Sequence, residues 1–126
     1  MIVDDEQLAL DTFERLLGRH GFRVFTALGA RQALEIIRNE PAIEIVLSDI
    51  IMPGMDGTEL VREIARVSPC TACVLMTAGG IERADVPDGV RLLRKPFRTG
   101  DLLTAIEQAV AATQLKLRAP EMGPAG

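Results

Sequence analysis

Aromatic residues are scarce in this sequence, which has no tryptophan, no tyrosine and four phenylalanines among its 126 residues. Proteins that stack single-stranded nucleic acid on aromatic platforms need more of them. An excess of positive charge is also missing, because the formal net charge is −4. We therefore expect neither direct binding of nucleic acid nor attraction to an anionic membrane.

Long apolar runs are absent as well. No stretch approaches the 18 or so consecutive apolar residues that a transmembrane helix requires. The first ten residues, MIVDDEQLAL, carry acids where a signal peptide has a basic flank and an apolar run. These features predict a cytoplasmic protein.

Cysteine and histidine are too few for a zinc site. The sequence has Cys70 and Cys73 in C-x-x-C spacing and a single, distant His20, whereas zinc takes four ligands. The segment CTACVLM is typical of a strand, where residues three apart face opposite sides about 10 Å apart. That separation is too long for a disulfide. We expect Cys73 in the core and Cys70 at a strand entry.

The chain length allows one domain and not two ordinary ones. Hydrophobic residues make up 48% and charged residues 25%, a composition that excludes a disordered chain. The last eight residues, APEMGPAG, contain two prolines and two glycines. We predict one domain over residues 1–118 and a flexible tail over residues 119–126.

Apolar runs and helical periods alternate along the chain, which predicts an α/β fold. Near-continuous apolar strands indicate a parallel sheet with helices on both faces, in a doubly wound, flavodoxin-like arrangement with strand order 2-1-3-4-5. The predicted strands are residues 1–3, 22–27, 43–49, 71–77 and 90–93. The predicted helices carry apolar periods at residues 9–17, 30–37, 60–67 and 102–117.

Polar residues follow four of the predicted strands at one edge of the sheet, where such folds bind ligands. They are Asp4-Asp5, Asp49, Thr77 and Lys95. Three carboxylates at one point repel one another, and a hard divalent cation such as Mg²⁺ relieves this repulsion. With an ammonium and a hydroxyl nearby, the set is typical of an aspartate that accepts a phosphoryl group.

Four segments of the chain resemble the receiver domains of two-component response regulators, members of the CheY-like superfamily. They are VDDE at residues 3–6, SDIIMPGMDG at 48–57, MTAGG at 76–80 and RKPF at 94–97. They occur in the family's order and near its spacing, each at a predicted strand end. The resemblance covers roughly residues 1–115.

The resemblance implies a metal site built around the phosphoacceptor. Asp49 is implied as the phosphoacceptor and as a ligand of Mg²⁺, which Mn²⁺ could replace. Asp5 is implied as a direct ligand, Asp4 as a ligand mainly through water, and the backbone carbonyl of Ile51 as a further one. These assignments are carried over from the family pattern.

The resemblance also implies a phosphoryl-binding pair and a response region. Thr77 and Lys95 are implied to bind the phosphoryl group, with a cis bond between Lys95 and Pro96. The positions implied for switching or output are Ala78, Gly79, Leu92 and Pro96.

The response region departs from the family pattern. Leu92 stands where the family commonly has Tyr or Phe, and only 17 residues separate Thr77 from Lys95. We therefore expect the family's fourth helix, between the fourth and fifth strands, to be short, irregular or absent. The short segment before the fifth strand is similar to that of receivers attached to hybrid sensor kinases. Ile51 and Gly79, which lack groups that orient water, imply a long-lived phosphorylated state.

The function implied is a phosphoacceptor switch of a phosphorelay, not a metabolic enzyme. A histidine kinase or phosphotransfer protein would donate to Asp49, and the signal would pass by protein–protein contact. Basic side chains gather in residues 90–118, six against two acids, as solvated helix faces or as a surface for an acidic partner.

Two other functions stay open at this point. A small Mg²⁺-dependent phosphatase with an aspartate nucleophile usually has a second acid two residues later, where this chain has Ile51. A flavin-binding domain of the same fold needs a phosphate-cradling turn that the strand-end loops lack. Turnover of a phosphomonoester and a bound flavin's colour would distinguish these alternatives.

Overall fold

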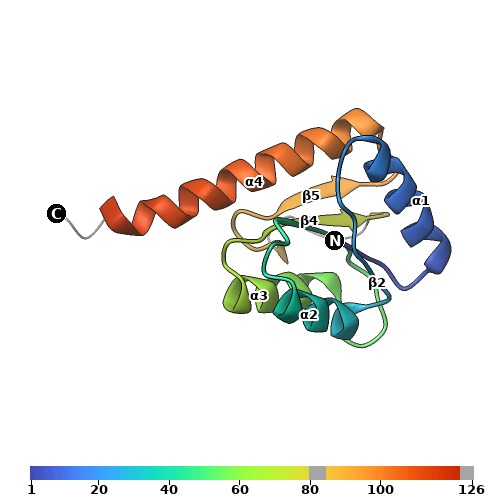
Figure 1. The fold of residues 1–126 in the computed structure, drawn as a ribbon, viewed down its shortest axis with the longest axis horizontal. Helices are drawn as coiled ribbons and strands as arrows, with labels where there is room; N and C mark the ends of the chain where they lie inside the picture. Colours follow the sequence, from blue (N-terminus) through green and yellow to red (C-terminus); the bar gives the residue numbers. More distant parts are fainter. Residues whose placement is uncertain (80–84, 123–126) are drawn as a thin grey trace.

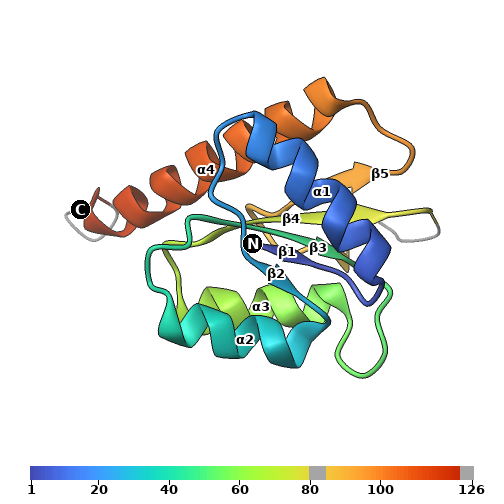
Figure 2. The same ribbon diagram turned by 45° about the vertical axis from the view of Figure 1, so that its right-hand side comes forward.

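A computed structural model describes residues 1–79 and 85–122. A central five-stranded sheet is covered by helices on both faces (Figures 1 and 2). All the strands are parallel, in the order β2-β1-β3-β4-β5, which confirms the predicted doubly wound fold. The strands are β1 (Ile2–Val3), β2 (Thr26–Ala27), β3 (Ile45–Asp49), β4 (Ala72–Thr77) and β5 (Arg91–Arg94). The helices are α1 (Gln7–Arg19), α2 (Ala30–Asn39), α3 (Gly57–Val67) and α4 (Thr99–Met122).

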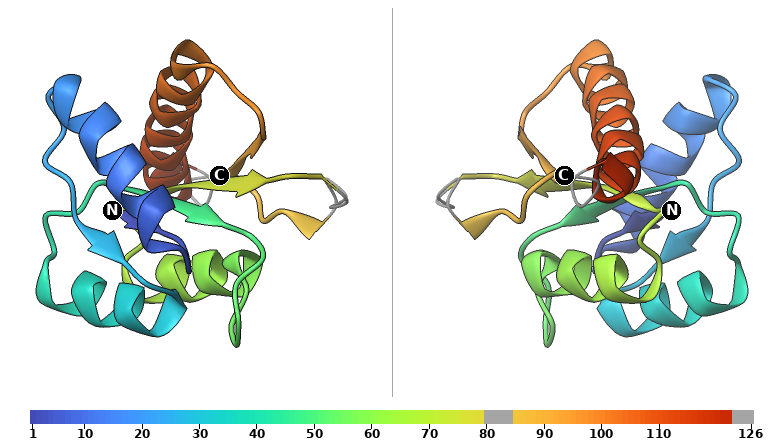
Figure 3. Two further views of the ribbon diagram at one scale, coloured as in Figure 1. Left: turned by 90° about the vertical axis from the view of Figure 1, so that its right-hand side faces the viewer. Right: turned by 90° about the vertical axis from the view of Figure 1, so that its left-hand side faces the viewer.

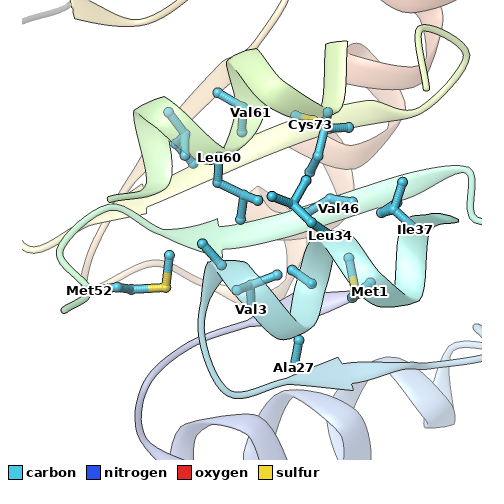
Figure 4. Packing of buried hydrophobic residues seen from close by; sticks show 14 of the residues in the cluster. Met1, Val3, Ala27, Leu34, Ile37, Val46, Met52, Leu60, Val61 and Cys73 are labelled. Carbon is cyan, nitrogen blue, oxygen red and sulfur yellow. The ribbon is translucent and has the colours of Figure 1, made fainter. Parts of the chain in front are cut away.

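Two apolar clusters hold the layers together. Helices α2 and α3 pack on one face of the sheet, and α1 and α4 pack on the other (Figure 3). Figure 4 shows the α2/α3 cluster, in which Leu34 and Leu60 meet Val46 of the central strand. Strands β3 and β4 contribute side chains to both clusters, so they are buried on both faces as their apolar sequences predict.

The helical periods predicted from the sequence match the buried faces. In α2 the buried residues lie at i, i+3, i+4 and i+7 from Ala30. Helix α3 buries Leu60, Val61 and Ile64, and its first turn is closed by a capping box between Asp56 and Glu59. The alternation of strands and helices is thus confirmed element by element.

The second strand is shorter than predicted. The sequence suggested a strand over residues 22–27, whereas β2 contains only Thr26 and Ala27. Its partner β1 also has only two residues, of which Ile2 pairs with Thr26 and Val3 pairs with Ala27. The Ile2 N–H reaches back to the Phe25 carbonyl at 2.8 Å. Residues 22–24 therefore lack a regular partner strand, although their side chains Phe22 and Val24 still pack on the α1/α4 cluster.

Helix α4 runs through Met122, so it includes residues 119–122, which the sequence predicted as part of a flexible tail. A proline removes one hydrogen bond of a helix and crowds the carbonyl four residues earlier, but the bonds of the preceding turns remain, so Pro120 alone does not end the helix there. Residues 123–126 of the predicted tail lie outside the described residues. No described helix is both long and apolar enough to cross a membrane.

The connection between β4 and β5 contains no α-helix in its described part, residues 78–79 and 85–90. This agrees with the expectation that the helix of the family between these two strands is short, irregular or absent, and residues 80–84 lie outside the described residues.

The two cysteines lie as expected. Cys73 is buried and Cys70 is exposed, and both are free. Burial raises the pKa of the Cys73 thiol to about 12.

Candidate functional site

Three carboxylates meet at the carboxyl edge of the sheet. Parallel pairing places Val3 of β1 beside Ser48 of β3, so the residues that follow β1 and end β3 come together. Carboxylate oxygens of Asp4, Asp5 and Asp49 all lie within 4.8 Å of one another. In the described part of the chain, no other group of His, Cys, Asp and Glu side chains converges in this way.

Asp4 is the buried member of the cluster, with 2% of its surface exposed. Burial raises the pKa of its carboxyl group, and the negative charge of Asp49 raises it further. The Glu6 N–H donates to Asp4 Oδ1 at 3.0 Å and opposes part of this rise. Like charges held together at such a point fit a hard divalent cation, because its charge offsets their repulsion.

Lys95 brings a positive charge to the cluster. It follows β5, and its Nζ lies 3.5 Å from Asp49 Oδ1. The Asp49 side chain is 18% exposed and that of Lys95 is 35% exposed. The Asp49 carboxylate is therefore fixed by its strand and still accessible from solvent. The Lys95–Pro96 peptide is cis, as the family resemblance implied.

Thr77 lies at the same edge, next to Lys95. It ends β4, and its carbonyl accepts from the Lys95 N–H at 2.7 Å. Its hydroxyl donates to the Gly79 carbonyl and accepts from the Gly79 N–H, both at 3.1 Å. Among the described hydrogen bonds, none joins Thr77 to Asp49. The structure thus brings Lys95 and the three acids together and leaves the Thr77 hydroxyl bonded to its own loop.

The other residues singled out from the sequence lie around this edge. The Ile51 side chain points to solvent and is 74% exposed, while Ile50 and Met52 on either side are buried. Leu92 is half-buried and packs on the α2/α3 cluster. Ala78 and Pro96 are exposed, and Gly79 has a φ of 137°, a conformation that favours glycine.

Two contacts behind Asp49 were not anticipated. The Ser48 hydroxyl donates to the Asp49 carbonyl at 2.9 Å. The N–H of Gly57, the last residue of the SDIIMPGMDG segment, donates to the Ile50 carbonyl at 2.7 Å. A glycine in a P-G-x-D-G segment carries no signal that separates a turn from a close approach between backbones.

Comparison with known proteins agrees with this geometry. The family model described as "Response regulator receiver domain" matches residues 1–107. Among curated proteins, the chain is 34% identical to the "Positive alginate biosynthesis regulatory protein" of Pseudomonas aeruginosa, over 99% of the chain and 52% of that protein. It is 32% identical to the "Transcriptional regulatory protein ZraR" of Escherichia coli O157:H7, over 91% of the chain and 27% of that protein. The chain thus spans about half the length of the first relative and about a quarter of the second.

Solved structures show the same likeness. A response regulator receiver domain protein from Clostridium thermocellum superposes with a TM-score of 0.78 at 29% identity, covering 90% of this chain and 94% of that one. The response regulator protein TrrA from Thermotoga maritima, in complex with Mg²⁺-BeF, superposes with a TM-score of 0.76 at 26% identity, covering 86% of this chain and 95% of that one. The chain therefore belongs to the family of response regulator receiver domains.

Proposed function

We propose that this receiver domain accepts a phosphoryl group on Asp49 from a phosphohistidine, in a Mg²⁺-dependent reaction, and signals by protein–protein contact. One observation carries the proposal: the accessible Asp49 carboxylate lies within 4.8 Å of two further carboxylates and 3.5 Å from the Lys95 ammonium. A nucleophile, a metal-binding pair of acids and a fixed positive charge thus share one edge of the sheet.

The residues divide the chemistry among them. A carboxylate oxygen of Asp49 attacks phosphorus, an O–P bond forms, and the N–P bond to the imidazole of the donor breaks with its electron pair going to nitrogen. Lys95 stabilises negative charge on the phosphoryl oxygens. Asp4 and Asp5, with Asp49 and the Ile51 carbonyl, would hold Mg²⁺. When bound, the ion supplies charge neutralisation at the phosphoryl group.

Thr77 links capture of the phosphoryl group to a structural change in the segment after β4. Its hydroxyl is bonded to both backbone groups of Gly79, so turning it toward a phosphoryl oxygen releases that glycine. Leu92 has neither a ring nor a hydroxyl to follow this movement. We therefore propose that phosphorylation changes the segment after β4, around Ala78 and Gly79, more than residue 92. Amide chemical shifts with and without a phosphoryl analogue measure this difference.

The partners belong to the proposal too. A histidine kinase or a histidine phosphotransfer protein would supply the phosphoryl group, in the cytoplasm. We propose that the output that follows phosphorylation is a contact with another protein. Attachment to a hybrid sensor kinase stays a prediction from the sequence.

The test is labelling by a small phosphodonor. With acetyl phosphate and Mg²⁺, the mass of the wild type should rise by one phosphoryl group, and hydroxylamine should remove it. Asp49→Asn keeps the shape of the side chain and removes the nucleophile, so labelling should be lost. The control is Asp11→Asn, which changes an exposed acid on α1 that accepts a bond from Gln7.

Two results would contradict the proposed function. Undiminished, hydroxylamine-sensitive labelling of Asp49→Asn would place the phosphoacceptor elsewhere. Steady turnover of p-nitrophenyl phosphate by the wild type, lost in Asp49→Asn, would instead support the phosphatase alternative.

A further inference from the structure

The peptide that joins Asp49 to Ile50 packs against the first residue of α3, Gly57. The Gly57 N–H donates to the Ile50 carbonyl at 2.7 Å, so one short bond links the exit of β3 to the start of α3. Gly57 is buried, and its φ lies outside the left-handed region, which other glycines of the chain occupy. Space, and not backbone conformation, therefore explains why glycine is needed at this position.

A side chain at position 57 has no room. A Cβ atom there would lie 2.4 Å from the Asp49 carbonyl oxygen, 2.8 Å from the Ile50 Cα and 3.0 Å from Leu75 Cδ2. The two shortest contacts are with backbone, which cannot rotate away as the end of a side chain can. Even to reach 3.0 Å, the closest pair must separate by about 0.6 Å, so either the Asp49–Ile50 backbone or the start of α3 has to move.

The start of α3 cannot yield freely, because its first turn is capped and the helix is anchored in the core. The Asp56 carboxylate accepts from the Glu59 N–H at 2.9 Å and from the Thr58 hydroxyl at 2.6 Å, and the Glu59 carboxylate accepts from the Asp56 N–H at 3.3 Å. Three fully buried or nearly fully buried side chains then anchor the helix in the core. They are Leu60, Val61 and Ile64. We therefore expect the backbone of Asp49 to take up part of the displacement, even though the Ile50 N–H donates to the Met76 carbonyl at 3.0 Å.

We infer that Gly57 is a positioning residue for Asp49. The missing side chain at position 57 lets the backbone of Asp49 sit at the depth from which its carboxylate meets Asp4, Asp5 and Lys95. This inference rests on the proposed function. A displacement approaching 1 Å would disturb the 3.5 Å contact with Lys95 and the carboxylate cluster, and such misplacement costs about a hundredfold in rate.

The test compares Gly57→Ala with two controls in two measurements. One measurement is the initial rate of Asp49 labelling by acetyl phosphate. The other is the affinity for Mg²⁺ by calorimetry, with no phosphodonor present. We expect Gly57→Ala to be labelled about 10- to 100-fold more slowly and to bind Mg²⁺ more weakly, while it still melts cooperatively.

The controls separate position from stability. Gly18→Ala adds the same methyl group within α1, where no atom of the described residues lies within 4 Å, and should change neither measurement. Ile64→Val removes buried volume from the helix that begins at Gly57. It should lower the melting temperature and leave labelling and Mg²⁺ affinity at the wild-type values. A merely structural role of Gly57 would make its variant behave like Ile64→Val.

Further variants keep the inference open to refutation. If Gly57→Ala is poorly folded, glycine and alanine at position 57 are compared in chains that also carry Gly18→Ala. That substitution should stabilise the fold, because alanine has a higher helix propensity than glycine. Adding Leu75→Val relieves only the 3.0 Å contact and should not restore labelling. Wild-type rate and Mg²⁺ affinity in Gly57→Ala, or rescue by Leu75→Val, would overturn the inference. If the wild type itself is not labelled, the proposed function fails, and Mg²⁺ affinity alone decides the role of Gly57.

Discussion

The connections that leave β3 and β4 begin at the same edge of the sheet and are held in different ways. The connection from Asp49 to α3 is closed by the Gly57–Ile50 backbone bond and by the capping box around Asp56. In the described part of the connection from Thr77 to β5, the bonds are those of the Thr77 hydroxyl to Gly79, a Val90–Pro87 turn and one contact from Arg62 to the Asp85 carbonyl.

Under the proposed function, this difference separates capture of the phosphoryl group from the response to it. The first connection carries the proposed phosphoacceptor, and its backbone bond and helix cap restrain it. The second begins with the Thr77 hydroxyl, which we propose exchanges Gly79 for a phosphoryl oxygen. A restrained acceptor beside a loop held by one exchangeable hydroxyl fits the proposed phosphorylation switch.

The largest expected effect is a difference in labelling rate between variants of Lys95 and of Leu92. Lys95→Ala removes the positive charge 3.5 Å from Asp49 and should slow labelling by a small donor about 100-fold. Leu92→Ala truncates a side chain of the response region and should change labelling less than about twofold, once rates are corrected for the folded fraction. Similar losses in both variants would show that capture and response are not separable.

The second effect concerns the lifetime of the phosphorylated state. Ile51→Asn places an amide, which can orient water, two residues after Asp49, and should speed decay in Mg²⁺ by about tenfold. The exposed side chain at this position tolerates the change, and Leu28→Asn, at an exposed leucine elsewhere, is the control. Gly79→Glu is a less suitable test, because Gly79 has a φ of 137°, at which any other residue is strained. Unchanged decay would mean that Ile51 does not control access of water.

The third effect concerns stability. Asp56→Ala removes the helix cap of the first connection and should lower the free energy of unfolding by about 1 kcal/mol. Asp85→Ala, in the second connection, should cost less than about half of this, because Asp85 contributes its backbone carbonyl. Chemical denaturation measures both values, and equal losses would remove the contrast between the two connections.

The contribution of Asp56 should also depend on pH. The hydrogen bond from the Thr58 hydroxyl, followed by that from the Glu59 N–H, lowers the pKa of Asp56 below its ordinary value. Its stabilising effect is therefore complete above the pKa of the unfolded chain, about 3.9, and is lost as pH falls further. The stability difference between the wild type and Asp56→Ala should shrink below about pH 4. A difference that grows there would contradict this assignment.

The smallest effect concerns encounter with the donor protein. Arg98 is exposed just after the Lys95–Pro96 bond, and Arg98→Glu should slow transfer from an acidic partner a few-fold at low salt only. Labelling by acetyl phosphate should stay the same, and Arg31→Glu, on α2, is the control. Arg91 is less suitable, because its Nε is buried and has no hydrogen-bond partner among the described residues. If Arg98→Glu and the wild type accept the phosphoryl group from the partner at equal rates at low salt, Arg98 has no electrostatic role in the encounter.

Sequence reasoning located the helices and the strand ends well because both leave strong local patterns. Apolar residues at helical spacing marked α2 and α3, and polar residues directly after apolar strands marked Asp4, Asp49 and Lys95. Boundaries that depend on a partner were less accurate. Strand β2 is short because β1 is short, and no pattern within residues 22–27 reveals this.

The sequence by itself determined the fold class and the residue types at the carboxyl edge, since periodicity and strand-end chemistry are local properties. Only the tertiary structure decided how the edge is assembled. It buried Asp4, placed Lys95 against Asp49 and left no room for a side chain at Gly57. These features depend on distances between segments far apart in the chain. Such distances are set by how the layers pack, and so no single segment encodes them.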